Sequence, residues 1–274
     1  MHPEYQYLKL LARILKDGKT KQSRGIESLK TVFGAQLRFD LRYGFPLMTT
    51  KKMFGFRALT HEMLWFISGD NQTPKYLNDN DVHIWDSFED AKSVKEGTLG
   101  RIYGVQWRHW RKPDGTEFDQ LQWVIDEIKN NPNSKAIVVS GWNAGELDEM
   151  RLPPCHTLFQ LDVIKGKLYM MLYQRSSDVF LGLPFNVAQY AELLMMIAKI
   201  TNLEARELVV SIGDAHLYGN QLEAAREQVI RKPMKFPKLL IHGNQKTIDD
   251  FKFDDFELVD YESHPAIKVP IVIV

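Results

Sequence analysis

The sequence predicts an α+β fold, with one domain over residues 1–274 built on a large mixed β-sheet with flanking helices. Segments whose apolar residues have helical spacing alternate with strand-like runs. The chain has 274 residues, of which 44% are hydrophobic, so it is long enough to bury one large core. No repeat, low-complexity tract or linker with a shift in composition divides it.

The helices are predicted from apolar spacing and from capping residues. Leu8, Leu11, Ile14 and Leu15 fall on one helical face, and Gly18 follows where a C-cap is expected.

Three further helices are predicted along the chain. The stretch "RALTHEMLWFISGD" should be a helix that ends at Gly69, and Asp119 is the expected N-cap of another, which stops at "NNPNS". The run "NVAQYAELLMMIAKI", residues 186–200, is apolar nearly all round and therefore predicts a buried central helix. Residues 70–116 are rich in turn signals and are expected to be irregular loops inserted into the domain.

The strands are predicted from β-branched and aromatic runs bounded by turn residues. The stretches "TLFQLDV" and "KLYMMLYQRS" are separated by "IKG", which is typical of a hairpin, and "AIVVSGW" precedes them. The stretches "ELVVSIGDAHLY", "KLLIHG" and "FELVDY" are predicted as later strands.

Charge and composition exclude several classes of function. The 35 basic and 35 acidic residues balance, so no overall field favours nucleic acid or an acidic membrane as a partner. The early charges of the N-terminal stretch, the single cysteine and the lack of a long apolar run predict a cytoplasmic protein without a disulfide or a membrane span. No metal-ligand spacing and no glycine-rich phosphate loop is present in the sequence, so no metal is expected.

Cys155, in "RLPPCHTLFQ", is the only cysteine in the chain and the first candidate for chemistry. A lone cysteine often only fills a core, whereas a nucleophilic one needs positive charge nearby to form the thiolate. Arg175, in "YQRSSD", lies on the partner strand of the predicted hairpin and supplies such a charge. His156 should point to the opposite face of the sheet from Cys155, so it is interpreted as a supporting residue.

Other polar residues in apolar surroundings are candidates as well. Glu62 interrupts an apolar helix face, where a carboxylate is costly unless it is paired or functional, although a surface position would also explain it. Asn186 could bind the edge of a nucleobase with its amide, or could simply cap the helix that follows. His216 and Tyr218, two residues apart in a strand, could hold a sugar hydroxyl or line the core.

These motifs together resemble the thymidylate synthase family, whose members methylate deoxyuridylate with a folate. The resemblance runs over nearly the whole chain and is carried by "RFDLRYGFPLMTTKK", "HEMLWFISGD", "LGRIYGVQWR", "RLPPCHTLFQ", "YQRSSDVFLGLPFNVAQYAELL", "GDAHLYGNQ" and "YESHPAIKVPI". It implies the family's fold, a covalent mechanism with 5,10-methylenetetrahydrofolate as co-substrate, and a homodimer that shares its phosphate site across subunits.

The resemblance assigns tasks to residues at matching positions. Cys155 matches the nucleophile that adds to C6 of the pyrimidine, Glu62 the carboxylate that moves protons through ordered water, and Tyr103 the tyrosine associated with removal of the C5 proton. Asn186 matches the amide that reads N3 and O4, and it favours uracil because an aspartate stands there in deoxycytidylate-hydroxymethylating relatives. Together the implied catalytic residues are Cys155, Glu62, Tyr103, Asn186, Arg175 and Asp178.

The resemblance also implies two binding sets. The substrate deoxyuridine monophosphate is expected to contact Arg24, Lys135, Ala136, Arg175, Ser176, Ser177, Asp178, Asn186, His216 and Tyr218. The folate is expected to contact Lys51, Phe54, Ile84, Trp85, Asp178, Leu181, Gly182, Phe185 and Val272.

The sequence departs from the family at the phosphate and folate ends. Lys135 and Ala136 stand where the family has an adjacent arginine pair, and Phe88 replaces a loop tryptophan. The loop after Arg24 and the C-terminal "KVPIVIV" also differ from the family pattern, and that terminus normally excludes water from the folate. A deoxyuridylate hydroxymethylase, in which water captures the methylene intermediate, is therefore the alternative activity. A degenerate relative that only binds nucleotides or RNA is the third hypothesis.

Overall fold

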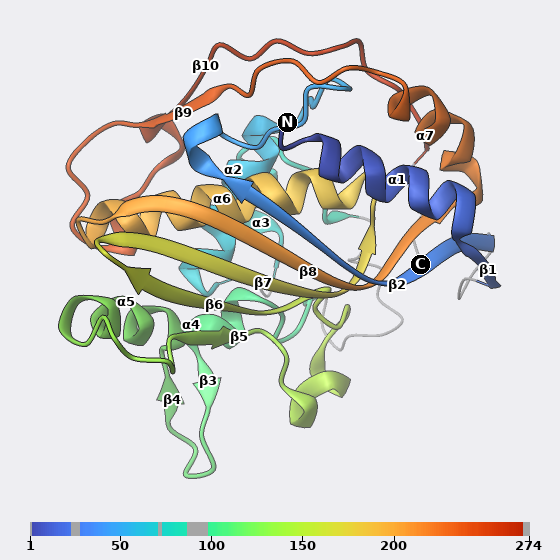
Figure 1. The fold of residues 1–274 in the computed structure, drawn as a ribbon. Coiled ribbons are helices and arrows are strands. Elements are labelled where there is room, and N and C mark those ends of the chain that lie inside the picture. The colour runs from blue at the N-terminus through green and yellow to red at the C-terminus, as the bar shows by residue number, and fades with distance from the viewer. Residues whose placement is uncertain (1, 23–27, 71–72, 87–97, 271–274) are drawn as a thin grey trace.

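The computed structural model describes residues 2–22, 28–70, 73–86 and 98–270. Its centre is a six-stranded mixed sheet with the strand order β1-β2-β8-β7-β6-β5 (Figure 1). The predicted mixed sheet with flanking helices is therefore confirmed. The strands of this sheet are β1 (Lys19–Gln22), β2 (Ser28–Asp40), β5 (Val138–Ser140), β6 (His156–Ile164), β7 (Lys167–Asp178) and β8 (Glu204–Tyr218).

The predicted hairpin is present as the antiparallel pair β6 and β7. Its turn residues Lys165 and Gly166 have φ angles of 50° and 73°, the left-handed backbone that a two-residue hairpin turn needs. Strand β7 then pairs with β8 in parallel, and this pairing places Asp178 beside His216. A parallel pair requires a crossover connection, which the helix α6 (Gly182–Ile200) supplies.

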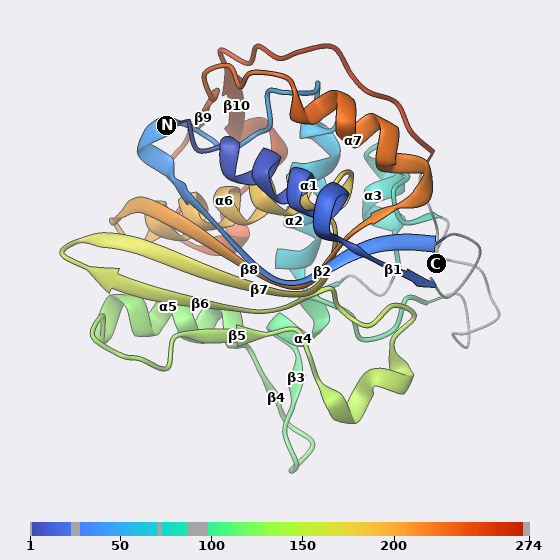
Figure 2. The ribbon, with the colours of Figure 1, turned by 45° about the vertical axis from the view of Figure 1, so that its right-hand side comes forward.

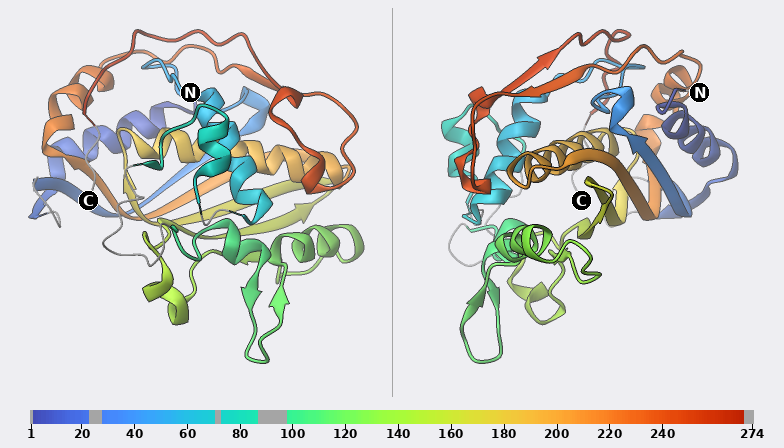
Figure 3. Two further views of the ribbon diagram at one scale, coloured as in Figure 1. Left: turned by 180° about the vertical axis from the view of Figure 1, so that it is seen from behind. Right: turned by 60° about the vertical axis from the view of Figure 1, so that its left-hand side comes forward.

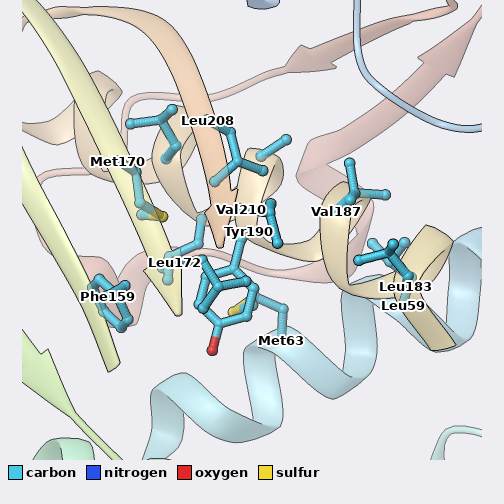
Figure 4. Close-up of a cluster of buried hydrophobic side chains, with 14 of the residues drawn as sticks. Leu59, Met63, Phe159, Met170, Leu172, Leu183, Val187, Tyr190, Leu208 and Val210 are labelled. Atoms are coloured by element: carbon cyan, nitrogen blue, oxygen red, sulfur yellow. The ribbon is translucent and has the colours of Figure 1, made fainter. Parts of the chain in front are cut away.

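Helix α6 lies along one face of the sheet, against β7 and β8, with α1 (Tyr5–Asp17) on the same side over β2 (Figures 1 and 2). Helix α2 (Phe56–Ser68) packs against α6 on its other side. Figure 4 shows this core, in which Leu59 and Met63 of α2 lie beside Leu183 and Tyr190 of α6, and Tyr190 lies against side chains of the sheet. Because α6 is covered on several sides, its apolar residues all find buried partners, as the sequence predicted.

The opposite face of the sheet is exposed and carries apolar side chains. Phe33 is 84% exposed, and Leu158, Met171 and Tyr173 are each about two-fifths exposed. These residues alternate along their strands with buried ones, since neighbouring strand residues point to opposite faces. One face of the sheet therefore carries the core, and the other exposes these apolar side chains among polar ones such as Gln36, Arg38 and Gln160.

The helix boundaries follow the predicted capping residues. The side chain of Asp119 accepts a hydrogen bond from the backbone of Gln122 at the start of α5 (Gln120–Asn130). Gly69 ends α2 with a φ of 72°, a conformation that glycine adopts without steric cost. Gly18 ends α1 but does so in an extended conformation.

Two expectations need correction. Helix α6 begins at Gly182, so Asn186 lies inside the first turns of the helix and cannot be its N-cap. Residues 70–116 are not simply irregular, because their described parts form two short helices and a hairpin that projects from the molecule (Figure 3). These elements are α3 (Lys75–Asp79), α4 (Gly104–Arg108), β3 (Trp110–Arg111) and β4 (Glu117–Phe118). Local turn signals hid them because their buried contacts, such as the ring of Trp107, come from distant parts of the chain.

The last two predicted strands form a separate small sheet. Strands β9 (Lys238–Ile241) and β10 (Phe256–Val259) pair only with each other and lie on the side of α6 away from the main sheet (Figures 1 and 2). Helix α7 (Leu222–Val229) connects β8 to this region and packs on α1. The short 3-10 helices are η1 (Leu41–Tyr43), η4 (Ala144–Glu149), η5 (Gly219–Gln221), η6 (Ile248–Asp250) and η7 (Phe253–Asp255). The domain assignment over residues 1–274, with insertions at about 70–116, stays a prediction.

Within the described ranges, no helix combines the length and the apolar composition that a membrane span requires. Helix α6 is the most apolar long helix, but Gln189, Glu192 and Lys199 interrupt it.

Glu192 is the costliest of these interruptions, because it is fully buried between α6 and α2. Its Oε1 accepts a hydrogen bond of 2.8 Å from the Thr60 hydroxyl, and its Oε2 has no hydrogen-bond partner among the described residues. Burial raises the pKa of Glu192 from its ordinary value of 4.5 to about 8. The carboxyl group is therefore protonated in the folded protein at neutral pH.

Glu192→Gln should make the fold more stable at pH 8 than at pH 5 relative to the original chain. Because the folded pKa is raised, the stability that neutral Glu192 supports is full below pH 4.5 and is lost as the pH rises towards 8. The advantage of glutamine should grow by up to about 1.4 kcal/mol per pH unit in that window. Chemical denaturation at several pH values measures it, with exposed Glu223→Gln as the matched control. Parallel stability curves for Glu192→Gln and the original chain would contradict the assignment.

Candidate functional site

Cys155 lies immediately before β6, and Arg175 faces it from β7. The Arg175 backbone amide donates to the Cys155 carbonyl at 2.9 Å, which fixes the two strands at this point. The Arg175 guanidinium donates to the carbonyls of Pro153 and Pro154, and its Nη2 lies 3.9 Å from the Cys155 sulfur. The predicted proximity of the cysteine and the arginine is therefore present, and the two prolines before Cys155 provide carbonyls that anchor the cation.

The protonation of Cys155 is set by two opposing effects. Burial raises the pKa of the thiol, while the positive charge of Arg175 and a hydrogen bond with Tyr103 lower it. Because burial is the larger effect, the resting group is a thiol. The adjacent guanidinium makes the thiolate accessible when a reaction consumes it.

Tyr103 reaches this site from the segment before α4. Its hydroxyl accepts a hydrogen bond of 3.0 Å from the Cys155 backbone amide. Its φ of 37° is uncommon for a residue with a side chain and costs free energy, which the surrounding contacts must offset. Stacking on Phe66, with ring centroids 4.7 Å apart, and close packing on His156 hold the ring in place.

Glu62 points from α2 into the same region and is desolvated. Trp85 Nε1 donates to Glu62 Oε1 at 2.5 Å, and Gln189 Nε2 donates to Oε2. Burial raises the pKa of Glu62, and these two hydrogen bonds act in the opposite direction by favouring the carboxylate. A surface role for Glu62 is thereby excluded, and the carboxyl group has the raised proton affinity typical of acid–base catalysts.

Asn186 projects from α6 into a buried network of polar side chains. Its Oδ1 accepts from Gln174 Nε2 at 2.7 Å, and its Nδ2 donates to His156 Nε2 at 3.1 Å. His156 Nδ1 in turn lies 3.1 Å from the hydroxyl of Tyr190. Burial lowers the pKa of His156 to about 3, so the ring is neutral and supports Asn186 as a hydrogen-bond acceptor. The interpretation of His156 as a supporting residue agrees with these contacts.

Asp178, at the end of β7, ties the start of α6 to the end of β8. Its Oδ1 accepts from the backbone amides of Phe180 and Leu181, and its Oδ2 accepts from Gln221 at 2.8 Å. His216 pairs with Asp178 across the parallel strands, and its ring packs edge-on against Tyr218 with centroids 5.2 Å apart. His216 and Tyr218 therefore lie on the same side of β8 at the site, as their spacing predicted.

Ser176 and Ser177 occupy the adjacent positions of β7, opposite Asp214 and Ala215 of β8. The Ser177 hydroxyl is buried and has no hydrogen-bond partner within the described part of the chain. Tyr218 completes this end of the site, and burial raises its pKa to about 12, so its phenol is neutral.

An adjoining pocket of about 440 Å³ brings together several residues of the predicted folate set. Lys51, Phe54, Leu181 and Phe185 line it, and the C-terminal segment 266–269 forms another wall. The tip of the Phe185 ring comes so close to Gly55 that a Cβ there would lie 2.5 Å from it, so a larger residue at this position would displace the ring. Gly182, the first residue of α6, lies next to Leu181, and Ile84 is partly exposed beside buried Trp85.

Lys51 is buried at the base of this pocket. Its ammonium donates to the carbonyl of Phe180 and lies 3.6 Å from the centroid of the Phe180 ring. Burial lowers the pKa of Lys51 to about 7, although the carboxylate of Asp178 acts in the opposite direction. Among the described residues, no group of three His, Cys, Asp or Glu side chains is arranged to hold a metal ion.

Lys135 and Ala136 are exposed and do not approach Cys155 within the chain. The Lys135 ammonium lies 3.4 Å from Asp162, near the far end of β6. Because strands rise about 3.3 Å per residue, the six residues from His156 to Asp162 span about 20 Å. Two other predicted site residues, Arg24 and Val272, lie outside the described residues, as does Phe88.

Sequence reasoning overlooked the amides that organise the site. Gln174, Gln189 and Gln221 contact Asn186, Glu62 and Asp178, and all three are fully buried. The signal for Gln189 was present, since it interrupts an otherwise apolar helix. Gln174 and Gln221 gave no comparable signal because strands and turns accept polar residues freely.

A thiol, a carboxyl group and an amide converge on one site, where Tyr103 contacts the Cys155 backbone and Gln189 contacts both Glu62 and Asn186. A family model described as thymidylate synthase matches residues 5–273. The chain therefore belongs to the thymidylate synthase family, an enzyme family of methyltransferases that bind deoxyuridylate and use methylenetetrahydrofolate.

Arg175→Gln should raise the pKa of Cys155 by about one pH unit, because it removes the cation that favours the thiolate. The rate of alkylation by iodoacetamide as a function of pH measures this pKa, and the single cysteine makes the signal specific. Arg175→Lys keeps the charge and should shift the pKa less. Equal alkylation profiles for all three proteins, each with native circular dichroism, would contradict the role of the charge.

Proposed function

We propose that this chain transfers a one-carbon unit from 5,10-methylenetetrahydrofolate to C5 of deoxyuridylate and reduces it, giving thymidylate and dihydrofolate. The observation that carries the proposal is the Cys155 thiol, placed 3.9 Å from the Arg175 guanidinium and next to the Tyr103 hydroxyl. Membership of the family supports the same assignment.

The sulfur of Cys155 adds to C6 of the pyrimidine, and the new S–C6 bond moves an electron pair towards C5 and O4. This addition makes C5 the carbon that attacks the one-carbon unit. The guanidinium of Arg175 stabilises the thiolate before addition and binds the substrate phosphate. When the product forms, the S–C6 bond breaks and Cys155 is released.

Glu62 moves protons at O4 of the pyrimidine and at the folate. Burial raises the pKa of Glu62, so the carboxyl group holds a proton more strongly than an exposed glutamate and can pass it on. Tyr103, whose hydroxyl lies beside the thiol site, assists removal of the proton from C5. Burial raises the pKa of this phenol well above 10, so it works by positioning a proton acceptor and not as a free phenolate.

Asn186 selects uracil. Its Oδ1 accepts one hydrogen bond from Gln174, and a carbonyl oxygen has a second lone pair for the N3–H of uracil. Cytosine carries no hydrogen at N3, so it would leave this lone pair facing another acceptor. His216 and Tyr218 bind the sugar hydroxyl, and Ser176 and Ser177, with Asp178 beside them, border the nucleotide.

The pocket beside the site has the composition that a folate requires. The rings of Phe54 and Phe185, together with Leu181, offer apolar contact to a flat ring system, and Trp85 contacts the acid, with Ile84 next to it in the chain. Lys51, Lys52 and Lys268 supply positive charge for carboxylates. When bound there, methylenetetrahydrofolate supplies both the carbon and the hydride.

The functional unit is a homodimer formed through the exposed face of the sheet, which covers Phe33, Leu158, Met171 and Tyr173. In this arrangement Lys135 and Ala136, about 20 Å along β6 from their own Cys155, serve the phosphate site of the partner subunit. A lysine keeps one positive charge, but it lacks the planar fork with which arginine binds a phosphate.

Mixing the protein with deoxyuridylate and methylenetetrahydrofolate should release dihydrofolate, seen as a rise in its absorbance band. Mass spectrometry should find a methyl group on the nucleotide, and 5-fluorodeoxyuridylate with the folate should form a covalent adduct. Cys155→Ala should fold normally and give none of these three results.

Other outcomes of this experiment overturn the proposal. A hydroxymethyl product would identify the alternative activity. The absence of both adduct and product in the original chain would identify a relative that only binds nucleotides.

Restoring the arginine pair with Lys135→Arg and Ala136→Arg should tighten binding of deoxyuridylate about tenfold, since arginine binds phosphate in a charge-assisted, bidentate manner. Calorimetric titration measures the affinity, and Lys129→Arg on α5, also exposed, is the matched control. An unchanged affinity of the double variant would mean that the pair does not reach a phosphate.

A further inference from the structure

Gln189 lies between two groups that the proposed mechanism uses. Its Nε2 donates to Oε2 of Glu62, and its Oε1 lies 3.4 Å from Nδ2 of Asn186. The same Nε2 is 3.5 Å from the carbonyl of Leu59, one helical turn before Glu62. A single amide on α6 therefore contacts the acid on α2 and the base-reading amide one turn earlier on its own helix.

The burial of Gln189 makes these contacts consequential. The side chain has no exposed surface, so each polar atom must find its partner within the protein. Its two ends are used differently, with the NH₂ group facing a carboxylate and the carbonyl facing an NH₂ group. An ionised carboxylate could not donate and an apolar side chain could do neither, whereas an amide donates at one end and accepts at the other.

The orientation of Asn186 determines which end of Gln189 faces it. Gln174 donates to Asn186 Oδ1, and neutral His156 accepts from Nδ2. The NH₂ group of Asn186 therefore points towards both His156 and Gln189. Gln189 accepts with its carbonyl oxygen, so its NH₂ group donates to Glu62.

We infer that Gln189 is a positioning residue that joins Glu62 and Asn186 in one hydrogen-bonded chain, so that the proton-transferring acid and the base-reading amide are held in a fixed relation. This inference rests on the proposed function, which gives Glu62 and Asn186 their tasks. Gln189 itself is assigned no contact with substrate or folate. Its effect passes through its two neighbours.

Two measurable properties should depend on this chain. The hydrogen bond that Gln189 donates favours the ionised form of Glu62 and keeps its pKa lower than burial alone would set it. The acceptor at Oε1 restricts rotation of the Asn186 amide, on which recognition of uracil depends. Loss of Gln189 should therefore alter both the titration of Glu62 and the preference for uracil.

Several other titratable groups lie near Glu62 on the elements that pack against α2. The phenols of Tyr103, before α4, and Tyr190, on α6, interact with its charge and have pKa values well above 10. Glu192, on α6, is held by Thr60 one turn from Gln189 and has a pKa of about 8. Elements η7 and α3 approach α2 at His61 and Arg57, on another part of the helix.

The test compares Gln189→Met with Gln228→Met, a matched buried glutamine that bridges Tyr7 and Thr50 away from the site. Carbon-13 NMR of glutamate-labelled, substrate-free protein measures the titration of Glu62, assigned with Glu62→Gln. All variants carry Glu192→Gln, which removes from the spectrum the neighbouring buried carboxyl group on α6. Gln189→Met should raise the pKa of Glu62 by about one pH unit, and Gln228→Met should leave it in place.

The second readout is the ratio of dissociation constants for deoxycytidylate and deoxyuridylate. Gln189→Met should lower this ratio about tenfold, whereas Gln228→Met should not change it. If Gln189→Met does not fold, Gln189→Ser replaces it, because serine is too short to reach Glu62 and Asn186 together.

An unmoved Glu62 titration, or a shift in only one of the two readouts, overturns the inference. Failure of the proposed function looks different, since the original chain would then make no thymidylate while the Glu62 titration still responded to Gln189. The two failures are therefore distinguishable.

Discussion

The burial of α6 is the constraint on which the rest of the structure depends. This helix is apolar on nearly every side, so it reaches a stable state only when the sheet covers one side and α2 covers another. Its polar residues Asn186, Gln189 and Glu192 are then carried into a region with little water, where each requires a partner or a change of protonation. The site is built from the contacts that meet this requirement, and each contact involves a second element of the fold.

The three polar residues of α6 meet this requirement in different ways. Asn186 bonds to Gln174 and His156 and keeps one lone pair of its carbonyl oxygen free, Gln189 connects to Glu62, and Glu192 is protonated. These outcomes differ because the available partners differ, since a neutral imidazole can accept, a carboxylate needs a donor, and a single hydroxyl cannot satisfy two oxygens. The same desolvation that makes these groups costly gives Glu62 and Cys155 their altered proton affinities.

Much of this architecture could be predicted from the sequence, and the failures have physical causes. Periodicity identified α2, α5, α6 and the β6–β7 hairpin because their apolar patterns extend over many residues. It failed for α3, α4 and the β3–β4 hairpin, which are too short to show a period and depend on distant contacts. The hairpin prediction placed Cys155 near Arg175 because the register of a hairpin is fixed by its own turn. Periodicity could not place Gln189 against Glu62, since that contact depends on how two helices rotate against each other.

The one parallel pair in the main sheet also has a consequence for how the molecule acquires its site during folding. Asp178 and His216 become neighbours only when β7 and β8 align, and the whole of α6 and the turn after it lie between them in sequence. Such a non-local pairing must offset the entropy of closing the loop before its contacts contribute. Hairpin β6–β7 can bring Cys155 to Arg175 early, from local contacts alone. The pocket lined by Leu181 and Phe185 and the pairing of Asp178 with His216 form only with this crossover, so a chain with only its helices and hairpin formed would still lack this part of the site.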